Sequence, residues 1–256
     1  MKAYLDLIGS DEYRLYKEAK QLGMVIEEGH VGDYAYYIKK NEDSLGIRVS
    51  ARQESNDSLM KLWARLEPRI EGKVYFLLNK DNKKFESFIS SKGFNFWHGT
   101  YELVYEGQAP EPVDLSIQAY RLEDFDSYIQ VLSCFSEVRK ACNLQPYDWY
   151  YHHQEEAKAS FNEHFIKNEI FSTLVDDKIV GVSIVEGQEI ELIAVHKDYQ
   201  GQGYGKKMLL HWMRYLIEEK GHSTIRLGML ASNDKALKLY TGVGFKACAG
   251  VRVLEN

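Results

Sequence analysis

The segment from Gln200 to Gly205 carries glycine at every second position, in the order Gln-Gly-Gln-Gly-Tyr-Gly. An expected strand precedes it and an expected helix follows it. Glycines allow successive backbone N–H groups to converge on an anion, and a helix N-terminus adds partial positive charge at the same place. The spacing therefore predicts phosphate binding, and a tight strand-to-helix turn without a ligand is the alternative.

Two other phosphate-binding patterns do not fit this segment. A P-loop has Ser or Thr directly after Gly-Lys and Gly at the position of Gln200, whereas Lys207 follows Gly205-Lys206 here. A dinucleotide-binding fingerprint has an acidic residue about 20 positions further on, where this chain has Met229–Ser232. Both patterns are excluded.

The elements that would position the loop follow from the spacing of apolar residues. A three-stranded antiparallel meander is predicted before the loop and an amphipathic helix, stopped by Gly221, after it. The predicted order is strand 116–120, helices from 122 to about 140 and from about 147 to 167, strands 171–175, 179–185 and 190–195, a helix over 209–217, strand 224–230, a helix from about 233 to 241, and strand 251–254. This order defines an α/β (α+β) domain.

Two motifs in this order resemble the GNAT family of acyl-CoA N-acetyltransferases. The first combines a Val-x-x-x-Tyr stretch, Val195 to Tyr199, with Gln-x-x-Gly-x-Gly over Gln200–Gly205. The second is Asn-x-x-Ala-x-x-Leu-Tyr-x-x-x-Gly-Phe, which runs without a gap from Asn233 to Phe245. The resemblance covers about residues 114–256. It implies a GNAT fold, with a central mixed, mostly antiparallel sheet flanked by helices.

The resemblance also implies a co-substrate, acetyl-CoA, and the residues that hold it. The backbone of the loop would bind the CoA diphosphate, and the pantetheine arm would pair with a strand that splays from the next one. Main-chain partners in that strand would be Ile193 and Val195. Asn233 would lie near the arm, and it can serve at the same time as the N-cap of its helix. The implied loop residues are Gln200, Gly201, Gln202, Gly203, Tyr204, Gly205 and Lys206.

Acetyl transfer to an amine requires removal of a proton. A lysine-like amine with a pKa of about 10.4 has a free lone pair in only about one molecule in 10³ at pH 7. Strand alternation predicts that Glu189, Glu191, Ile193 and Val195 share one face, with Ile190, Leu192 and Ala194 on the other. The resemblance favours Glu189 as the general base. A solvated Glu189, or Glu191 acting through water, is the alternative.

Tyr240 matches the family's proton donor to the departing CoA sulfur. Full transfer from a phenol of pKa near 10 to a thiolate of pKa near 8.5 is uphill by roughly 2 kcal/mol, so donation of a hydrogen bond can suffice. Tyr240 also falls on the apolar stripe of its helix, which leaves a core position as the alternative.

The N-terminal part of the chain repeats the end of this pattern weakly. At a constant offset Asn82 faces Asn233, and Gly93-Phe94 faces Gly244-Phe245. The pattern predicts a shortened domain of the same fold at 1–112 and a catalytic domain at 113–256, with the boundary in the Pro-containing segment at 108–112. Residues 50–56 of the first domain lack glycine and contain Glu54. We therefore expect no CoA binding there and one active site per chain.

The composition of the chain limits the kinds of partner and cofactor that we expect. The net charge of −6 is dispersed and forms no basic stripe, so nucleic acid is not expected, and no apolar run is long enough for a membrane span. Three cysteines without Cys-x-x-Cys spacing and no apolar leader indicate a reduced, cytoplasmic protein. His152 and His153 lack metal-ligand spacing, so no metal is expected.

The expected acceptor is a primary amine of a small molecule or a peptide, and the acetyl group is expected to pass to it directly in a ternary complex. The aromatic cluster of Tyr147, Trp149, Tyr150 and Tyr151 suits packing or, with Asp148, a cationic amine. A non-catalytic CoA-binding regulatory module is the alternative function. The N-terminal domain is expected to cap the acceptor side or to mediate a homodimer.

Overall fold

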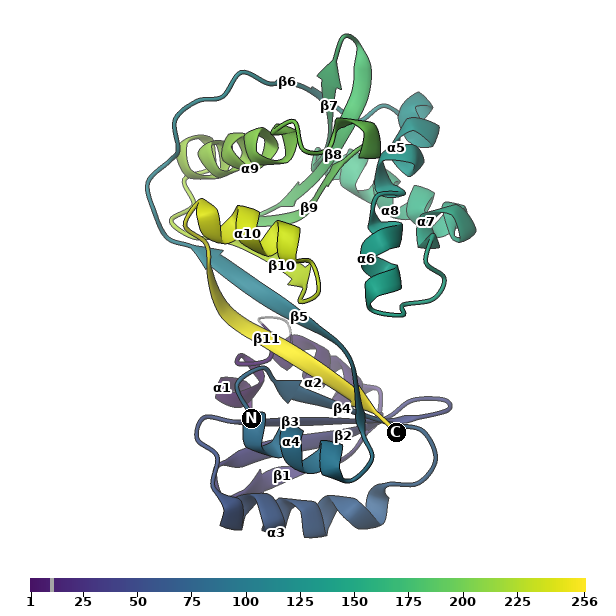
Figure 1. Cartoon of the computed structure of the whole chain (residues 1–256), viewed down its shortest axis with the longest axis vertical. Coiled ribbons are helices and arrows are strands. Elements are labelled where there is room, and N and C mark those ends of the chain that lie inside the picture. The colour runs from purple at the N-terminus through teal and green to yellow at the C-terminus, as the bar shows by residue number, and fades with distance from the viewer. Residues whose placement is uncertain (10–11) are drawn as a thin grey trace. The chain divides into compact units, whose positions relative to one another are not determined.

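The computed structural model describes residues 1–9 and 12–256. The chain forms two compact units, each of which includes segments that are distant in the sequence (Figure 1). Unit 1 contains Met1–Glu102, Met229–Ala231 and Ala247–Asn256, and unit 2 contains Leu103–Gly228 and Ser232–Lys246. Across these described residues, no helix combines the length and the apolar character needed to cross a membrane.

Unit 1 is a mixed sheet with helices, and its strand order is β1-β2-β3-β4-β11-β5. The first three strands form an antiparallel meander, β3 pairs with β4 in parallel, and β4 pairs with β11 antiparallel. The strands are β1 (Val25–Val31), β2 (Tyr34–Lys40), β3 (Leu45–Ala51), β4 (Val74–Asn79), β5 (Asn95–Tyr105) and β11 (Lys246–Glu255). The helices are α1 (Lys2–Leu5), α2 (Glu12–Gln21), α3 (Asn56–Leu66) and α4 (Lys83–Ser91).

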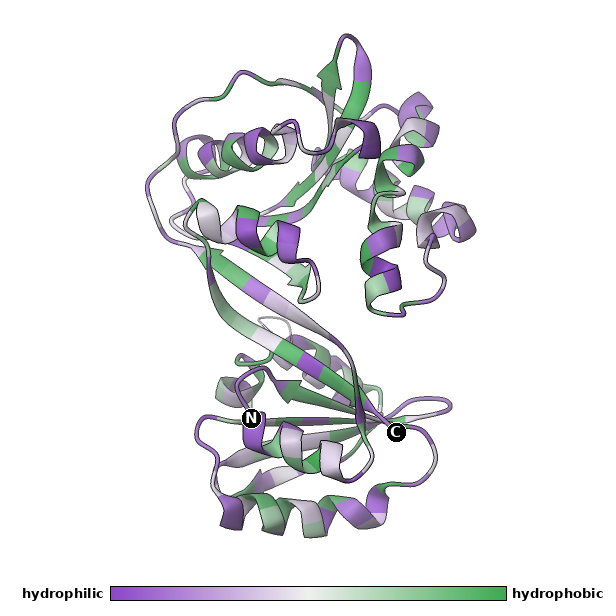
Figure 2. Ribbon diagram, in the orientation of Figure 1, coloured by the Kyte–Doolittle hydropathy of each residue, from purple (hydrophilic) through white to green (hydrophobic). Residues whose placement is uncertain are grey.

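The apolar spacing of α3 explains how unit 1 packs. Ser55 caps the helix by accepting a hydrogen bond from the Ser58 N–H at 3.2 Å. Leu59, Leu62, Trp63 and Leu66 then fall on one buried face, and Figure 2 shows hydrophobic and hydrophilic residues alternating along this helix. They join buried residues of β2, β3, β4 and α4 in one core.

Unit 2 is also a mixed sheet with helices, and its strand order is β10-β9-β8-β7-β6. The β6–β9 pairings are antiparallel, and β9 and β10 are parallel. The strands are β6 (Ser116–Ala119), β7 (Ile170–Val175), β8 (Lys178–Glu186), β9 (Glu189–Val195) and β10 (Ile225–Leu230). The helices are α5 (Phe125–Leu132), α6 (Phe135–Ala141), α7 (Trp149–His152), α8 (Gln154–Lys167), α9 (Tyr204–Arg214) and α10 (Asp234–Gly242).

The predicted order of elements is confirmed, but the first two predicted helices are each divided. The helix expected from 122 to 140 breaks at Ser133, whose hydroxyl donates to the Gln130 carbonyl at 2.6 Å and so competes with the helical ladder. The helix expected from 147 to 167 is α7 followed by α8. The last strand is longer than predicted, and α9 continues into a π-helical turn at Tyr215–Glu219.

Helices cover both faces of the β7-β8-β9 sheet. Val182 and Ile184 of β8 and Ala194 of β9 belong to a core with buried residues of α5 and α8. On the opposite face, a Cβ added to Gly181 would lie 2.7 Å from the sulfur of Met208 in α9, so α9 packs closely on β8 here and a larger residue would displace the Met208 side chain. Figure 1 shows α5 and α9 on opposite sides of β8.

The two units share one order of elements. In each, an antiparallel meander is followed by a helix (α3 or α9), a parallel strand (β4 or β10), a helix (α4 or α10) and a long strand (β5 or β11). Residues that the repeat aligns are buried in both units, as Phe94 and Phe245 show. The two units therefore have related folds.

Candidate active site

Strands β9 and β10 pair only near their N-terminal ends. Arg226 is the single β10 residue with a Cα partner in β9, Glu189, and its N–H donates to the Gln188 carbonyl at 3.0 Å. Both strands lie wholly within the described residues. On its other side β9 remains paired with β8 as far as Val195. The two parallel strands therefore diverge toward their carboxyl ends.

The divergence leaves peptide groups of β9 directed toward β10. The His196 N–H donates to the Val180 carbonyl at 2.8 Å, and alternate residues of an antiparallel strand bond to the same neighbour. The peptide groups of Ile193 and Val195 consequently point away from β8. The Val195 carbonyl accepts from the Gln200 side chain at 3.1 Å, and its backbone lies in hydrogen-bonding reach of the Cys134 thiol. Both partners are side-chain groups.

The loop after β9 presents a series of backbone donors. Gly201 and Gly203 have φ of +77° and +88°, which L side chains adopt only with strain. The first intrahelical bond of α9 runs from the Lys207 N–H to the Gly203 carbonyl at 3.1 Å. In the part of the chain that the structure describes, no acceptor is assigned to the N–H groups of 201–206, and residues 201–203 are exposed.

Gly205 joins three elements at this loop. A Cβ on Gly205 would lie 3.7 Å from a Val195 methyl and 3.8 Å from a Leu239 methyl. The start of α9 therefore packs against the end of β9 and against α10 at once. This packing brings α10, with its predicted site residues, to the loop of predicted site residues.

Asn233 and Tyr240 occupy the two ends of α10. Asn233 is the N-cap, and its carbonyl oxygen accepts from the Ala236 N–H at 3.1 Å. Tyr240 is half-buried, and its ring centroid lies 6.1 Å from that of Phe245. Burial raises the pKa of the Tyr240 hydroxyl above its ordinary value of 10. The hydroxyl therefore keeps its proton throughout the neutral range.

A bulge in β9 changes the predicted side-chain alternation. Val185 of β8 pairs with Ile190, but the preceding β8 residue pairs with Leu192, so Glu191 is an extra residue on β9. An extra residue shifts the alternation of a strand by one position. The prediction that one face carries every second residue from Glu189 to Val195 is therefore wrong. Glu189 itself is half-buried, at the start of the strand.

The bulge directs Glu191 toward α8. A carboxylate oxygen of Glu191 lies 3.6 Å from Nε2 of His164, and Nδ1 of the same ring lies 3.1 Å from a carboxylate oxygen of Glu169. The sequence analysis missed His164 and Glu169. The available signal was weak, since it consists of a histidine in the last turn of a helix and a glutamate five residues later.

The aromatic cluster of α7 mainly serves packing. Trp149 and Tyr150 lie against the core of α5 and α8, and Tyr151 is exposed. Burial, and then the nearby Cys134 and Glu191, raise the pKa of Tyr150 to about 12, so the phenol is neutral. Asp148 is 3.1 Å from His152 on the surface.

One group of side chains has the composition of a metal site. Ligand atoms of His164, Glu169 and Glu186 lie within 4.8 Å of one another. The Lys167 ammonium, however, is 3.4 Å from Glu186 and 3.9 Å from Glu169. A lysine in this position supplies the positive charge that a cation would otherwise bring, so these residues form an ion-pair network.

The corresponding region of unit 1 is closed. Strands β3 and β4 keep five registered pairs, from Leu45 with Val74 to Val49 with Leu78. Asn82, the counterpart of Asn233, donates to the Ala51 carbonyl and accepts from the Ala51 N–H, both at 2.8 Å.

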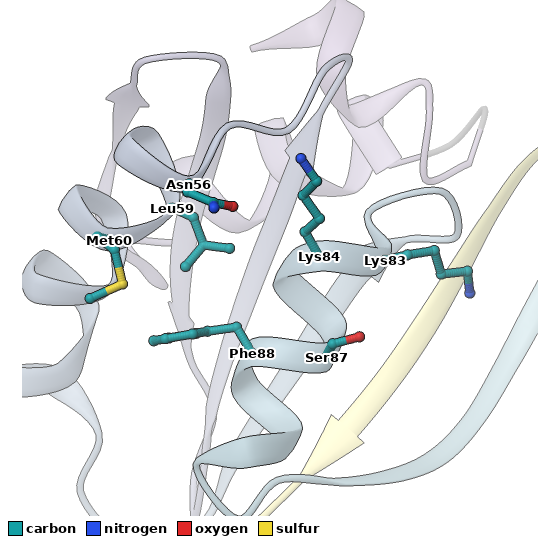
Figure 3. Close-up of a pocket in the computed structure, with 7 residues that line it drawn as sticks. All are labelled: Asn56, Leu59, Met60, Lys83, Lys84, Ser87 and Phe88. Atoms are coloured by element: carbon teal, nitrogen blue, oxygen red, sulfur yellow. The ribbon is translucent and has the colours of Figure 1, made fainter.

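Glu54 occupies the N-terminus of α4 in unit 1. Its carboxylate accepts from the backbone N–H groups of Lys84 at 2.8 Å and Phe85 at 2.9 Å. A groove of about 620 Å³ lies between α3 and α4. Figure 3 shows Leu59 and Met60 of α3 opposite Phe88 of α4.

Residues 167–247 match the family model described as acetyltransferase (GNAT) domain. This range contains β7 to β10, the loop, α9 and α10, so unit 2 is similar to a GNAT acetyltransferase domain over these residues. Two solved structures show the same fold. A GNAT-family acetyltransferase from Colwellia psychrerythraea aligns with a TM-score of 0.57, 14% identity and 96% of both chains covered. A GCN5-related N-acetyltransferase from Sphaerobacter thermophilus aligns with a TM-score of 0.55, 12% identity, and 88% and 76% of the two chains covered.

Curated relatives match over a shorter segment. The [ribosomal protein bS18]-alanine N-acetyltransferases of Escherichia coli K12 and Shigella flexneri are each 45% identical to the chain over 53 residues. The match covers 21% of this chain and 35% of each relative. The chain thus spans about a third of the length of these curated relatives.

Proposed function

We propose that the protein is an acetyl-CoA-dependent N-acetyltransferase that moves an acetyl group to a primary amine of a small molecule or a peptide. The observation that carries the proposal is the row of N–H groups at 201–206 without a recorded acceptor, exposed at 201–203, beside the divergent ends of β9 and β10. A helix N-terminus with free amides suits a diphosphate, and a strand edge with free peptide groups suits a pantetheine arm.

The residues of unit 2 fit CoA on three counts. The positive φ values of Gly201 and Gly203 turn the loop so that its amides face outward, and Lys206 adds positive charge. Ile193 and Val195 direct peptide groups to the open edge, where the Gln200 side chain now holds the Val195 carbonyl and would have to release it. Asn233 caps the start of α10, the helix whose Leu239 packs near Gly205 of the loop.

Acetyl-CoA would supply the thioester whose C–S bond breaks as the amine nitrogen forms a C–N bond. The protein must then take a proton from nitrogen and stabilise negative charge on sulfur. For the first role we propose Glu189, with Glu191 as the second candidate. For the second we propose Tyr240, whose raised pKa keeps it a hydrogen-bond donor. A hydrogen bond to a charged acceptor is worth about 1.5–3 kcal/mol.

Direct transfer in a ternary complex is favoured over an acetylated cysteine. Burial raises the pKa of the Cys134 thiol to about 11, so only about one molecule in 10⁴ carries a thiolate at pH 7. The thiolate is the nucleophile in a covalent route, so Cys134 is a poor candidate for one.

The relatives' name describes acetylation of an alanine of ribosomal protein bS18. This supports an amine acceptor for the present chain, and a peptide with a free N-terminus is the first probe to test. A protein α-amine has a pKa of about 7.7–8.0, so a tenth or more is already unprotonated at pH 7.

Gly203→Ala tests the loop. Alanine at φ +88° costs about 1–2 kcal/mol, which corresponds to about 5- to 30-fold weaker CoA binding if the loop conformation is what binds. Gly221→Ala is the matched control, because Gly221 also has a positive φ, +72°, and lies outside the loop. Binding is measured by calorimetry with CoA and with pantetheine, which lacks the diphosphate.

We expect Gly203→Ala to weaken CoA binding and to leave pantetheine binding unchanged. Equal affinity of the wild type for CoA and pantetheine would refute the diphosphate site. Tight CoA binding without acetyl transfer to a broad panel of amines and peptides would instead favour a non-catalytic CoA-binding module.

A further inference from the structure

A row of three side chains connects the surface of β9 to the buried end of α8. The Glu191 carboxylate is 3.6 Å from His164 Nε2, and His164 Nδ1 is 3.1 Å from the Glu169 carboxylate. We propose that Glu191, His164 and Glu169 form a proton relay that accepts the proton of the acceptor amine. This inference rests on the proposed function and assigns the base that it left between two candidates.

Exposure gives the relay a direction. The Glu191 side chain is 48% exposed, whereas those of His164 and Glu169 are 11% and 17% exposed. Glu191 can therefore meet an acceptor from solvent, and the ring behind it cannot. The β9 bulge produces this arrangement, because regular alternation from Val195 would turn residue 191 to the face covered by α9.

The hydrogen bonds define where the proton can move. A carboxylate only accepts, so Nδ1 of His164 donates to Glu169. The proposed relay requires that Nε2, which faces Glu191, carries a lone pair before the transfer. The 3.6 Å separation is longer than a hydrogen bond, so a small movement of either side chain must bring Nε2 and the carboxylate together before the proton passes.

Each proton transfer in the proposed relay balances. The amine N–H bond breaks as an O–H bond forms on Glu191. That O–H bond breaks as an Nε2–H bond forms, which gives an imidazolium paired with the Glu169 carboxylate. The proton returns to solvent by the reverse path after the acetylated amine has left. No oxidant or metal is involved.

The surrounding charges suit a ring that becomes positive during the transfer. Glu169, which is largely buried, and Glu186, which is exposed, contribute negative charge, and Lys167 offsets part of it. His164 also lies in the last turn of α8, where the helix carbonyls carry partial negative charge. Tyr150, near Glu191 on α7, stays neutral because burial raises its pKa to about 12.

The kinetic test compares wild type with His164→Gln and Glu169→Gln. The probes are a lysine-free peptide with N-terminal alanine and an N-terminally blocked peptide with a single lysine, whose amines have pKa values of about 7.7–8.0 and 10.4. General-base catalysis contributes about 10²- to 10⁴-fold, so at pH 7 we expect His164→Gln to lower kcat/KM for the lysine peptide by at least about 100-fold.

The alanine peptide should be affected less, and its kcat/KM in His164→Gln should approach that of the wild type near pH 9, where the amine is free. A merely structural role would give the same loss at every pH. His222→Gln, in the turn before β10, is the histidine control and should follow the wild type. A His164→Gln profile parallel to that of the wild type for both peptides would overturn the relay.

A second measurement needs no acceptor. The ¹⁵N spectrum of the histidine rings in the full chain, assigned with His164→Gln, should show a proton on Nδ1 of His164. A ring that carries its proton on Nε2 alone would overturn the relay, even if the protein transfers acetyl groups. Conversely, a wild type that binds CoA yet acetylates no amine would refute the proposed function and the relay together, whatever the tautomer.

Discussion

In unit 1, both polar atoms of the Asn82 side-chain amide form hydrogen bonds to the last residue of β3, Ala51. It accepts from the Ala51 N–H and donates to the Ala51 carbonyl, both at 2.8 Å, and both residues are 2% exposed. Replacing Asn82 by alanine leaves a buried N–H without a partner. The carbonyl keeps only a long contact to the Asn79 amide at 3.5 Å.

The expected cost follows from these two bonds. An unsatisfied buried donor or acceptor costs about 1–3 kcal/mol, so Asn82→Ala should destabilise the fold by about 2–5 kcal/mol. Urea unfolding of the full chain measures this free energy, and hydrogen exchange at the Ala51 amide locates it. Asn95→Ala is the control, because Asn95 is exposed and bonds only to the Gly93 carbonyl at 3.3 Å; it should change stability by less than about 0.5 kcal/mol. A loss below about 1 kcal/mol with unchanged Ala51 protection would refute the argument that Asn82 closes this strand pair.

Two predictions concern unit 2. Tyr240→Phe should lower kcat by about 10- to 150-fold, the equivalent of one hydrogen bond to a charged sulfur, and leave the CoA dissociation constant within about twofold. In the wild type, burial raises the pKa of Tyr240, so titration of this residue should cause no loss of kcat below pH 10. An unchanged kcat in the variant would exclude the proposed role of Tyr240. Cys134→Ala should keep kcat within about threefold and give intersecting double-reciprocal plots, because a thiol of pKa about 11 is protonated at neutral pH. Parallel plots for the wild type, together with an acetylated Cys134 in its mass spectrum, would contradict direct transfer.

Periodicity was sufficient to predict the order of elements in unit 2. The helix α9 shows why: Leu209, Trp212, Met213 and Leu216 recur at helical spacing, and all four are buried. The helix break at Ser133 could not be predicted from periodicity, because it depends on a single hydrogen bond, from the Ser133 hydroxyl to the Gln130 carbonyl of the same helix.

The site was harder to predict where it depends on long-range register. Regular alternation placed Glu191 with Val195, but β8 and β9 accommodate an extra residue, and no property of the segment 189–195 alone reveals that. His164 was missed for the same reason. It lies 27 positions before Glu191 in the sequence, and only the folded sheet brings them within 3.6 Å.

The contrast between the two units bears on how many sites the chain has. The asparagine at this position bonds differently in the two units. Asn233 accepts a hydrogen bond from the Ala236 N–H of its own helix, whereas Asn82 bonds to the main chain of Ala51 in β3. A strand end held in this way cannot offer its peptide groups to a pantetheine arm, and five registered pairs leave no divergence between β3 and β4 for the arm to enter. Separating β3 from β4 would break backbone hydrogen bonds along their five registered pairs, whereas β9 and β10 have a single registered pair. We therefore infer that acetyl-CoA binds to unit 2 alone.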